Sequence, residues 1–224
     1  MISVGIIDSG VPEPAPACLM EARGFRYEQG RVVERDNESG DRLGHGGMIT
    51  RIIIAGSPEV ALYSAQVFQE KLLTRPAQVA AAIDWLLERR VRIVNMSFGL
   101  GADRAILREA CARAVKQGVV LVASVPARGS AVYPGAYPGV IRVSGDARCG
   151  PGEISSIDGD LCYFGAYADG DAGSGSSAAA ARVSAAIAMI LSAYPTAGDA
   201  DVFNRLKNSA AYVGRERRIP KTPA

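Results

Sequence analysis

Three side chains that can share an acyl-transfer reaction stand far apart in the chain. Asp8 ends the apolar run Val4-Gly-Ile-Ile7, His45 lies between glycines, and Ser177 directly precedes four alanines. Acyl transfer by serine needs a hydroxyl, a base within hydrogen-bond reach and an acid that orients the base. Since His45 is the only histidine in the chain, it is the single candidate for the imidazole base.

Each of these residues also has a plainer interpretation, which stays open when it is considered singly. Asp8 can cap the turn at Ser9-Gly10, and Ser177 can cap the helix that follows it. A lone histidine is more often a surface or core residue than a catalyst. Taken together, however, the three residue types supply a nucleophile, a base and an orienting acid. A serine at a helix N-terminus also gains the helix dipole and a free N–H group for a developing oxyanion.

The elements that position these residues follow from hydrophobic periodicity and from glycine and proline signals. The pattern predicts strands over 4–8, 60–68, 91–96, 119–123 and 140–144. It predicts helices over 48–55 (beginning near His45), 78–89, 104–116, 178–193 and 199–208. Between residues 12 and 44 only a short strand near Val32 and Val33 is predicted. Strands that alternate with helices indicate an α/β fold with a mainly parallel sheet, whose active site lies at the carboxyl ends of the strands.

Length and composition restrict the class of protein. The 224 residues predict one domain over 1–214 and a basic, flexible tail over 215–224. With 25 basic and 23 acidic residues, the net charge of +2 argues against a nucleic-acid partner. No apolar run approaches the roughly 20 residues that span a bilayer, which argues against a membrane protein.

The N-terminus and the cysteines predict the compartment. The first ten residues contain no signal-peptide pattern, so we expect a cytoplasmic protein. The four cysteines, Cys18, Cys111, Cys149 and Cys162, form no C-x-x-C pair, so we expect free thiols, no metal site and no cofactor. A redox role for Cys149 and Cys162 is the less favoured interpretation of that pair.

Five segments resemble motifs of the subtilisin-like serine proteases, in the same order along the chain. They are Val4-Gly-Ile-Ile-Asp8-Ser-Gly10, Gly44-His45-Gly-Gly-Met-Ile-Thr50, Asn95-Met-Ser-Phe-Gly99, Tyr133-Pro-Gly-Ala-Tyr-Pro-Gly-Val-Ile-Arg-Val143 and Gly175-Ser-Ser177-Ala-Ala-Ala-Ala-Arg-Val183. The order Asp, His, Ser is also that of subtilisin. The resemblance implies a three-layer fold with a mainly parallel sheet flanked by helices. It also implies a triad in which Ser177 attacks, His45 transfers the proton and Asp8 orients His45.

The resemblance further implies how a substrate is held, and it exposes one departure. An extended substrate is expected along the segment Ser97, Phe98 and Gly99 and along Ala123, Ser124 and Val125. The backbone N–H of Ser177 is expected in the oxyanion hole. The asparagine that usually completes that hole is replaced near Ala127, and Arg128 and Ser130 are the candidate substitutes. Ala181 and Arg182 also replace the family's Pro-His pair.

These departures favour a slow enzyme with one dedicated substrate. We expect a serine endopeptidase that matures a precursor peptide or protein by removing its leader. The chain is similar to the small subtilases that mature quinohemoprotein amine dehydrogenase, which implies the small subunit of that enzyme as a candidate substrate. Two alternatives remain open: a pseudoprotease that only binds peptides, and a macrocyclase whose acyl-enzyme is captured by an amine. The sequence does not determine the oligomeric state.

Overall fold

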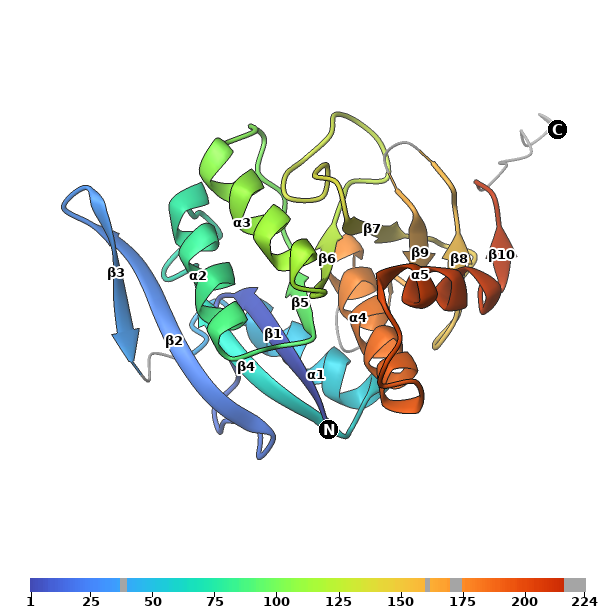
Figure 1. Ribbon diagram of the computed structural model, residues 1–224, viewed down its shortest axis with the longest axis horizontal. Helices are drawn as coiled ribbons and strands as arrows, with labels where there is room; N and C mark the ends of the chain where they lie inside the picture. Colours follow the sequence, from blue (N-terminus) through green and yellow to red (C-terminus); the bar gives the residue numbers. More distant parts are fainter. Residues whose placement is uncertain (37–39, 160–161, 170–174, 216–224) are drawn as a thin grey trace, which may run out of the picture.

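The computed structural model describes residues 1–36, 40–159, 162–169 and 175–215 (Figure 1). In chain order its elements are β1 (Ile2–Asp8), β2 (Leu19–Glu28), β3 (Arg31–Asp36), α1 (His45–Gly56), β4 (Val60–Gln66), α2 (Pro76–Glu88), β5 (Ile93–Met96), α3 (Ala105–Lys116), β6 (Val120–Ser124), β7 (Val140–Gly145), β8 (Ile154–Ser156), β9 (Phe164–Ala166), α4 (Gly175–Ala193), α5 (Asp199–Asn208) and β10 (Tyr212–Val213).

The strands form one sheet in the order β10-β8-β9-β7-β6-β5-β1-β4-β2-β3. Only the β2–β3 and β8–β9 pairs are antiparallel. The chain adds β4 on one side of β1 and then returns to add β5 on the other side. This reversal of direction lies at the carboxyl ends of β1 and β5, where α/β sheets leave a crevice for ligands. Asp8 is the last residue of β1, so it stands at that crevice.

Helices cover both faces of the sheet, as the sequence pattern predicts for a three-layer fold. Buried residues of α1, α4 and α5 form one core cluster with alternate strand residues such as Val4 and Ile6. Buried residues of α2 and α3 form a second cluster on the opposite face, with strand residues such as Val94 and Met96. This division follows from the period-2 alternation of side chains along a strand.

Helix α4 is buried along most of its length because it consists of small and apolar residues. Among the described residues it is the one helix long and apolar enough, by length and composition, to cross a membrane. Ala178–Ala181 and Val183 lie instead in the core against the sheet and α1. Alanine at these positions allows α1 and α4 to approach closely, and their N-termini carry His45 and Ser177.

Every helix that the sequence predicts is present, with boundaries that differ by a few residues at most. The five predicted strands are also present as β1, β4, β5, β6 and β7. Between residues 12 and 44 the predicted short strand near Val32 and Val33 is present as part of β3, but β2, which forms a hairpin with β3 at one edge of the sheet, was missed (Figure 1). Its mixed charged and apolar residues do not give the apolar signature of a buried strand. The short strands β8, β9 and β10 were also missed, since two or three residues are too few for a periodicity.

The four cysteines are free thiols. Burial raises the pKa of Cys149, and it raises the pKa of Cys162 to about 11, so the protonated form of both thiols is favoured. Protonated, buried thiols react slowly, so the structure offers no support for a redox role. The predicted basic tail lies outside the described residues beyond Arg215, so its flexibility stays a prediction.

The close contact of α1 with α4 predicts a compensating pair of substitutions. A Cβ atom added at Gly56 would lie 2.7 Å from the Cβ of Ala185. We therefore expect Gly56→Ala to reduce the free energy of unfolding by about 1–3 kcal/mol through overpacking. Adding Ala185→Gly removes the Cβ that the new methyl group meets, so it should recover most of that lost stability. Urea unfolding of the single and double variants measures both changes. A Gly56→Ala variant as stable as the wild type would contradict this account of the helix contact.

Candidate active site

The structure brings Asp8 and His45 into direct contact. The Nδ1 atom of His45 lies 2.7 Å from Oδ1 of Asp8. Asp8 is fully buried, whereas the His45 side chain is 19% exposed. With Nδ1–H donating to the carboxylate, Nε2 is the nitrogen left to accept a proton from another group. This is the arrangement of an orienting acid and a base that the sequence predicts.

A second carboxylate, that of Asp41, fixes the loop that carries His45. Its Oδ1 atom accepts hydrogen bonds from the backbone N–H groups of Leu43 and Gly44, at 3.0 and 2.9 Å. Its Oδ2 atom accepts one from the N–H of Gly47, at 2.6 Å. Asp41 thus satisfies donors in the first turn of α1, and its charge is favourable at that helix end.

Ser9 connects the two carboxylates. Its hydroxyl lies 2.8 Å from Asp41 Oδ1 and 3.2 Å from Asp8 Oδ1, and it accepts a hydrogen bond from the N–H of Gly46 at 2.9 Å. The N–H of Ser9 donates to Asp8 Oδ1 at 2.7 Å. The strand end that holds the acid and the helix start that holds the base are therefore joined through one serine.

Close packing reinforces this junction. A Cβ atom at Gly46 would overlap the backbone carbonyl oxygen of Gly10, so only glycine fits where α1 meets the end of β1. The side-chain amide of Gln66, at the end of β4, donates to the carbonyls of Ser9 and Gly40 at 2.7 and 2.9 Å. Three chain segments are held together around the Asp8–His45 pair.

The electrostatic surroundings raise the pKa of His45 above its ordinary value of 6.5. The hydrogen bond to Asp8 is the largest cause, and the negative charges of Asp8 and Asp41 act in the same direction. Burial opposes them, because it disfavours the imidazolium. The two carboxylates therefore stabilise the protonated form of His45.

Ser177 is the third residue of α4, and its hydroxyl donates to the backbone carbonyl oxygen of Ser97 at 2.9 Å. Among the described residues no hydrogen bond joins Ser177 to His45. Helices α1 and α4 pack side by side, and both begin at the edge of the sheet where β1 and β5 end. The structure thus brings the serine to the same edge as the Asp8–His45 pair, with its hydroxyl turned toward β5.

A buried polar network links this serine to the core. Ser184 donates to Asn95 Oδ1 at 2.9 Å, and Asn95 donates from Nδ2 to the Ser97 hydroxyl, also at 2.9 Å. Ser97 in turn donates to the carbonyl oxygen of Ser177 at 3.1 Å. Because an unpaired polar group in an apolar core is costly, this chain of bonds specifies how α4 sits on β5.

The residues predicted around the oxyanion hole lie on the loop after β6. Ala127, Arg128 and Ser130 are all exposed there. Ala127 has no side-chain donor, so the substitution inferred from the sequence leaves no amide at this position. The N–H of Ser177 belongs to the first turn of α4, where N–H groups have no partner within the helix. Which of these groups completes an oxyanion hole stays a prediction.

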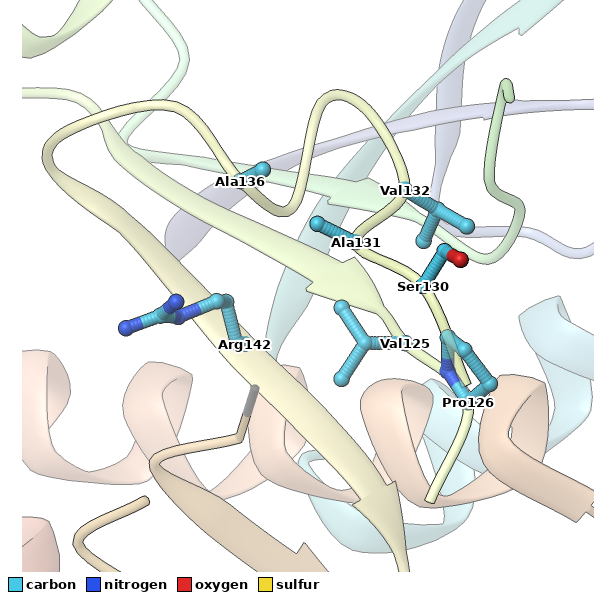
Figure 2. Close-up of a pocket in the computed structure, with 7 residues that line it drawn as sticks. All are labelled: Val125, Pro126, Ser130, Ala131, Val132, Ala136 and Arg142. Carbon is cyan, nitrogen blue, oxygen red and sulfur yellow. The ribbon is translucent and has the colours of Figure 1, made fainter. Parts of the chain in front are cut away.

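The predicted substrate-binding segments lie at the carboxyl ends of β5 and β6, the position at which α/β sheets leave a crevice for ligands. The two strands are parallel, with Met96 opposite Ala123, and Ser97–Gly99 and Ser124–Val125 continue from them. Beside this crevice lies a small cavity lined by Val125, Pro126, Ser130, Ala131, Val132, Ala136 and Arg142 (Figure 2). In Figure 2 the side chain of Val125 extends toward the side of the view on which Arg142 lies, and that of Val132 extends away from Ala136.

Sequence reasoning missed the residues that support the site. Ser9 and Asp41 carried a signal, since one adjoins Asp8 and the other lies four residues before His45. Gln66 and Ser184 carried none, because their partners are distant in the chain. Among the described residues no group of three histidine, cysteine or acidic side chains could hold a metal ion.

The fold and a buried Asp–His pair beside a serine at a helix start define the subtilisin-like class of serine-type endopeptidases. The profile of the Subtilase family matches residues 1–221, and the chain belongs to that family.

Curated relatives include subtilisin DY of Bacillus licheniformis, which is 28% identical over 238 residues. The match covers 95% of this chain and 85% of that relative. Subtilisin E of Bacillus subtilis (strain 168) is 26% identical over 247 residues, covering 95% of this chain. The chain spans only 61% of the length of subtilisin E.

Solved structures with a similar fold include the psychrophilic protease S41, with a TM-score of 0.70, 21% identity, and coverage of 92% of this chain and 82% of that one. A mutant of the protease domain of PatA gives a TM-score of 0.66 at 21% identity, covering 87% and 80%. A lanthipeptide protease gives a TM-score of 0.72 at 20% identity, covering 96% and 81%. These likenesses show the fold.

The raised pKa of His45 predicts the pH dependence of serine reactivity. A base with a raised pKa becomes available only at higher pH, so the acid limb of the rate of labelling by a fluorophosphonate should lie above pH 6.5. Asp41→Asn removes one charge that favours the imidazolium and should move this limb to lower pH. The control is Asp84→Asn on α2, which breaks an exposed ion pair with Arg113 on α3. An acid limb that does not move in Asp41→Asn would contradict the role assigned to this carboxylate.

The polar network predicts a difference between two isosteric variants. Ser184→Thr keeps the hydroxyl that donates to Asn95, whereas Ser184→Val has the same shape without it. We expect the valine variant to be about 1–3 kcal/mol less stable than the threonine variant, because Asn95 loses a buried partner. Fluorophosphonate labelling should also be slower with valine than with threonine. Equal stability and equal labelling rates of the two variants would show that the network does not position Ser177.

Proposed function

We propose that this subtilase uses Asp8, His45 and Ser177 as a catalytic triad. The observation that carries the proposal is the buried hydrogen bond between His45 Nδ1 and Asp8 at the carboxyl end of β1. Its partner serine stands at the N-terminus of α4, at the same edge of the sheet. No other histidine exists in the chain to act as the base.

In this mechanism Ser177 Oγ forms a bond to the scissile carbonyl carbon while His45 Nε2 takes the hydroxyl proton. The carbonyl oxygen takes the electron pair and becomes an oxyanion. Its collapse breaks the C–N bond, and His45 returns the proton to the leaving amine. Water then attacks the acyl-enzyme by the same proton route. Asp8 keeps the imidazole in one tautomer and stabilises its charged form throughout.

The hydroxyl of Ser177 has to leave the carbonyl of Ser97 before it reaches His45. Rotation about one side-chain bond is a small motion for a half-buried serine. We propose that an extended substrate lies along Ser97–Gly99 and Ala123–Val125, where the substrate backbone competes for these carbonyls. The oxyanion would then meet the N–H of Ser177, with Ser130 or Arg128 as the second donor. Loss of one such donor typically lowers turnover by roughly 10²–10³-fold, a figure measured within this family.

A slow enzyme suits a single dedicated cleavage, so we propose that the substrate is a precursor peptide or protein that loses its leader. The small subunit of quinohemoprotein amine dehydrogenase is our first candidate. The likeness in fold to a lanthipeptide protease and to the protease domain of PatA accords with peptide processing. We further propose a cytoplasmic location, which the four free thiols favour.

One observation favours a second candidate, a peptide-binding pseudoprotease. The hydroxyl of Ser177 is hydrogen-bonded to the carbonyl of Ser97 rather than to His45, and the loop after β6 contains no side-chain amide. A macrocyclase would use the same acyl-enzyme but transfer it to an amine. The mass of the product separates these outcomes, because hydrolysis adds one water to the substrate and cyclisation does not.

Labelling by a fluorophosphonate tests the nucleophile without a known substrate. We expect the wild type to be labelled at Ser177 and the Ser177→Ala variant to be unlabelled. Ser176→Ala removes the neighbouring hydroxyl instead and should keep labelling. Folded wild-type protein that stays unlabelled, even with the candidate precursor present, would favour the pseudoprotease. When labelling succeeds, the precursor is incubated with the enzyme, and mass spectrometry identifies the cleaved bond.

A further inference from the structure

We infer that the residue directly before the scissile bond must be small: glycine, alanine or serine. The inference rests on the proposed function, since it concerns the substrate of the same site. The observations behind it are the positions of two valine side chains, Val125 and Val132, which occupy the space beside the ends of β5 and β6.

The position of this space follows from the course of the chain. The carbonyl of Ser97 contacts the hydroxyl of Ser177, so the segment after β5 begins at the nucleophile. Three residues further, Leu100 pairs with Tyr133 through two backbone hydrogen bonds of 2.6 and 2.8 Å. This pairing brings the loop 130–136 against the crevice and closes its side. The side chain of the substrate residue directly before the scissile bond, next to Ser177, would therefore contact this loop and the end of β6.

Val125 fills the first part of that space. It is 5% exposed, and its Cγ1 atom lies 2.5 Å from where a Cβ of Gly135 would stand. Glycine at 135 is thus what leaves room for the valine. The isopropyl group occupies volume that a smaller residue at 125 would leave to a substrate.

Val132 fills the second part. A Cβ atom at Gly99 would lie 2.6 Å from Val132 Cγ2 and 2.8 Å from its Cβ. The backbone of Gly99 and the side chain of Val132 are therefore in close contact. Because Gly99 belongs to the segment proposed to pair with the substrate, Val132 reaches the position that a bulky substrate side chain would need.

The cavity left between these groups has a volume of about 10 Å³. That is about the space needed for one water molecule, and it is far too small for a leucine or phenylalanine side chain. Arg142 lines the cavity, but its guanidinium lies 4.0 Å from the centre of the Tyr163 ring and is engaged in a cation–π contact. In Figure 2 it points away from Ser130. The size of the cavity thus favours a small side chain.

The test uses tripeptidyl phosphonate esters that carry a glycine, alanine, leucine or phenylalanine analogue at the reacting position. These probes bond irreversibly to an active serine, so slow reactions accumulate signal. We expect the alanine probe to react roughly 10- to 200-fold faster than the phenylalanine probe, the range that pocket contacts of this kind produce. Val125→Ala and Val132→Ala should each enlarge the cavity and reduce that preference severalfold. Val213→Ala, at a residue 75% exposed on β10, is the matched control and should leave it unchanged.

The outcomes separate the two proposals. A wild type that reacts equally fast with the leucine or phenylalanine probe overturns the inference, and so does failure of every peptidyl probe while the fluorophosphonate still labels Ser177. If the fluorophosphonate also fails, the proposed function falls, and the inference falls with it. Urea unfolding of each valine variant shows that altered preference does not come from a damaged fold. If Val125→Ala unfolds, Val132→Ala tests the same cavity from the other side.

Discussion

The buried carboxylate of Asp8 is the constraint on which the rest of the site depends. A charge with no exposed surface is costly unless its oxygens accept strong hydrogen bonds. Oδ1 accepts from His45 and from the backbone of Ser9, while Oδ2 has no hydrogen-bond partner among the described residues. The hydrogen bond from the His45 imidazole therefore offsets much of the free-energy cost of burying the Asp8 carboxylate. The hydrogen bonds of Asp41 and the close packing at Gly46 hold that imidazole within hydrogen-bond distance of Asp8.

The serine is held by a different kind of interaction. A chain of hydrogen bonds between uncharged groups runs from Ser184 through Asn95 and Ser97 to the carbonyl of Ser177. The α4 residues around it are mainly buried alanines and valine. Neutral bonds in an apolar setting give direction without adding charge near the imidazole. The acid–base pair and the nucleophile are thus anchored to separate strands, β1 and β5, which are neighbours in the sheet. Their alignment depends on the register of those two strands.

The filled side-chain pocket that we infer, together with an alanine where the family's asparagine is usual, predicts low general activity toward peptides. Both features lie on one loop system, residues 125–136, after β6. Binding energy for a substrate must then come from a longer stretch of its main chain and from residues further from the scissile bond. This accords with one dedicated precursor, since remote contacts can compensate for a weak reacting centre.

The sequence by itself determined the fold class, because strands and helices alternate with clear hydrophobic periods, and it supplied the candidates Asp8, His45 and Ser177 by their type and local setting. It also indicated that Ala127 stands where an amide is usual. It indicated part of β3 but did not reveal β2, whose mixed residues are held in place by pairing with β4. Nor did it reveal Gln66, Ser184 or Val132, whose partners lie tens of residues away, although it did place Val125 beside the substrate. Contacts at long sequence separation depend on strand register and helix packing, so only the tertiary structure decided them.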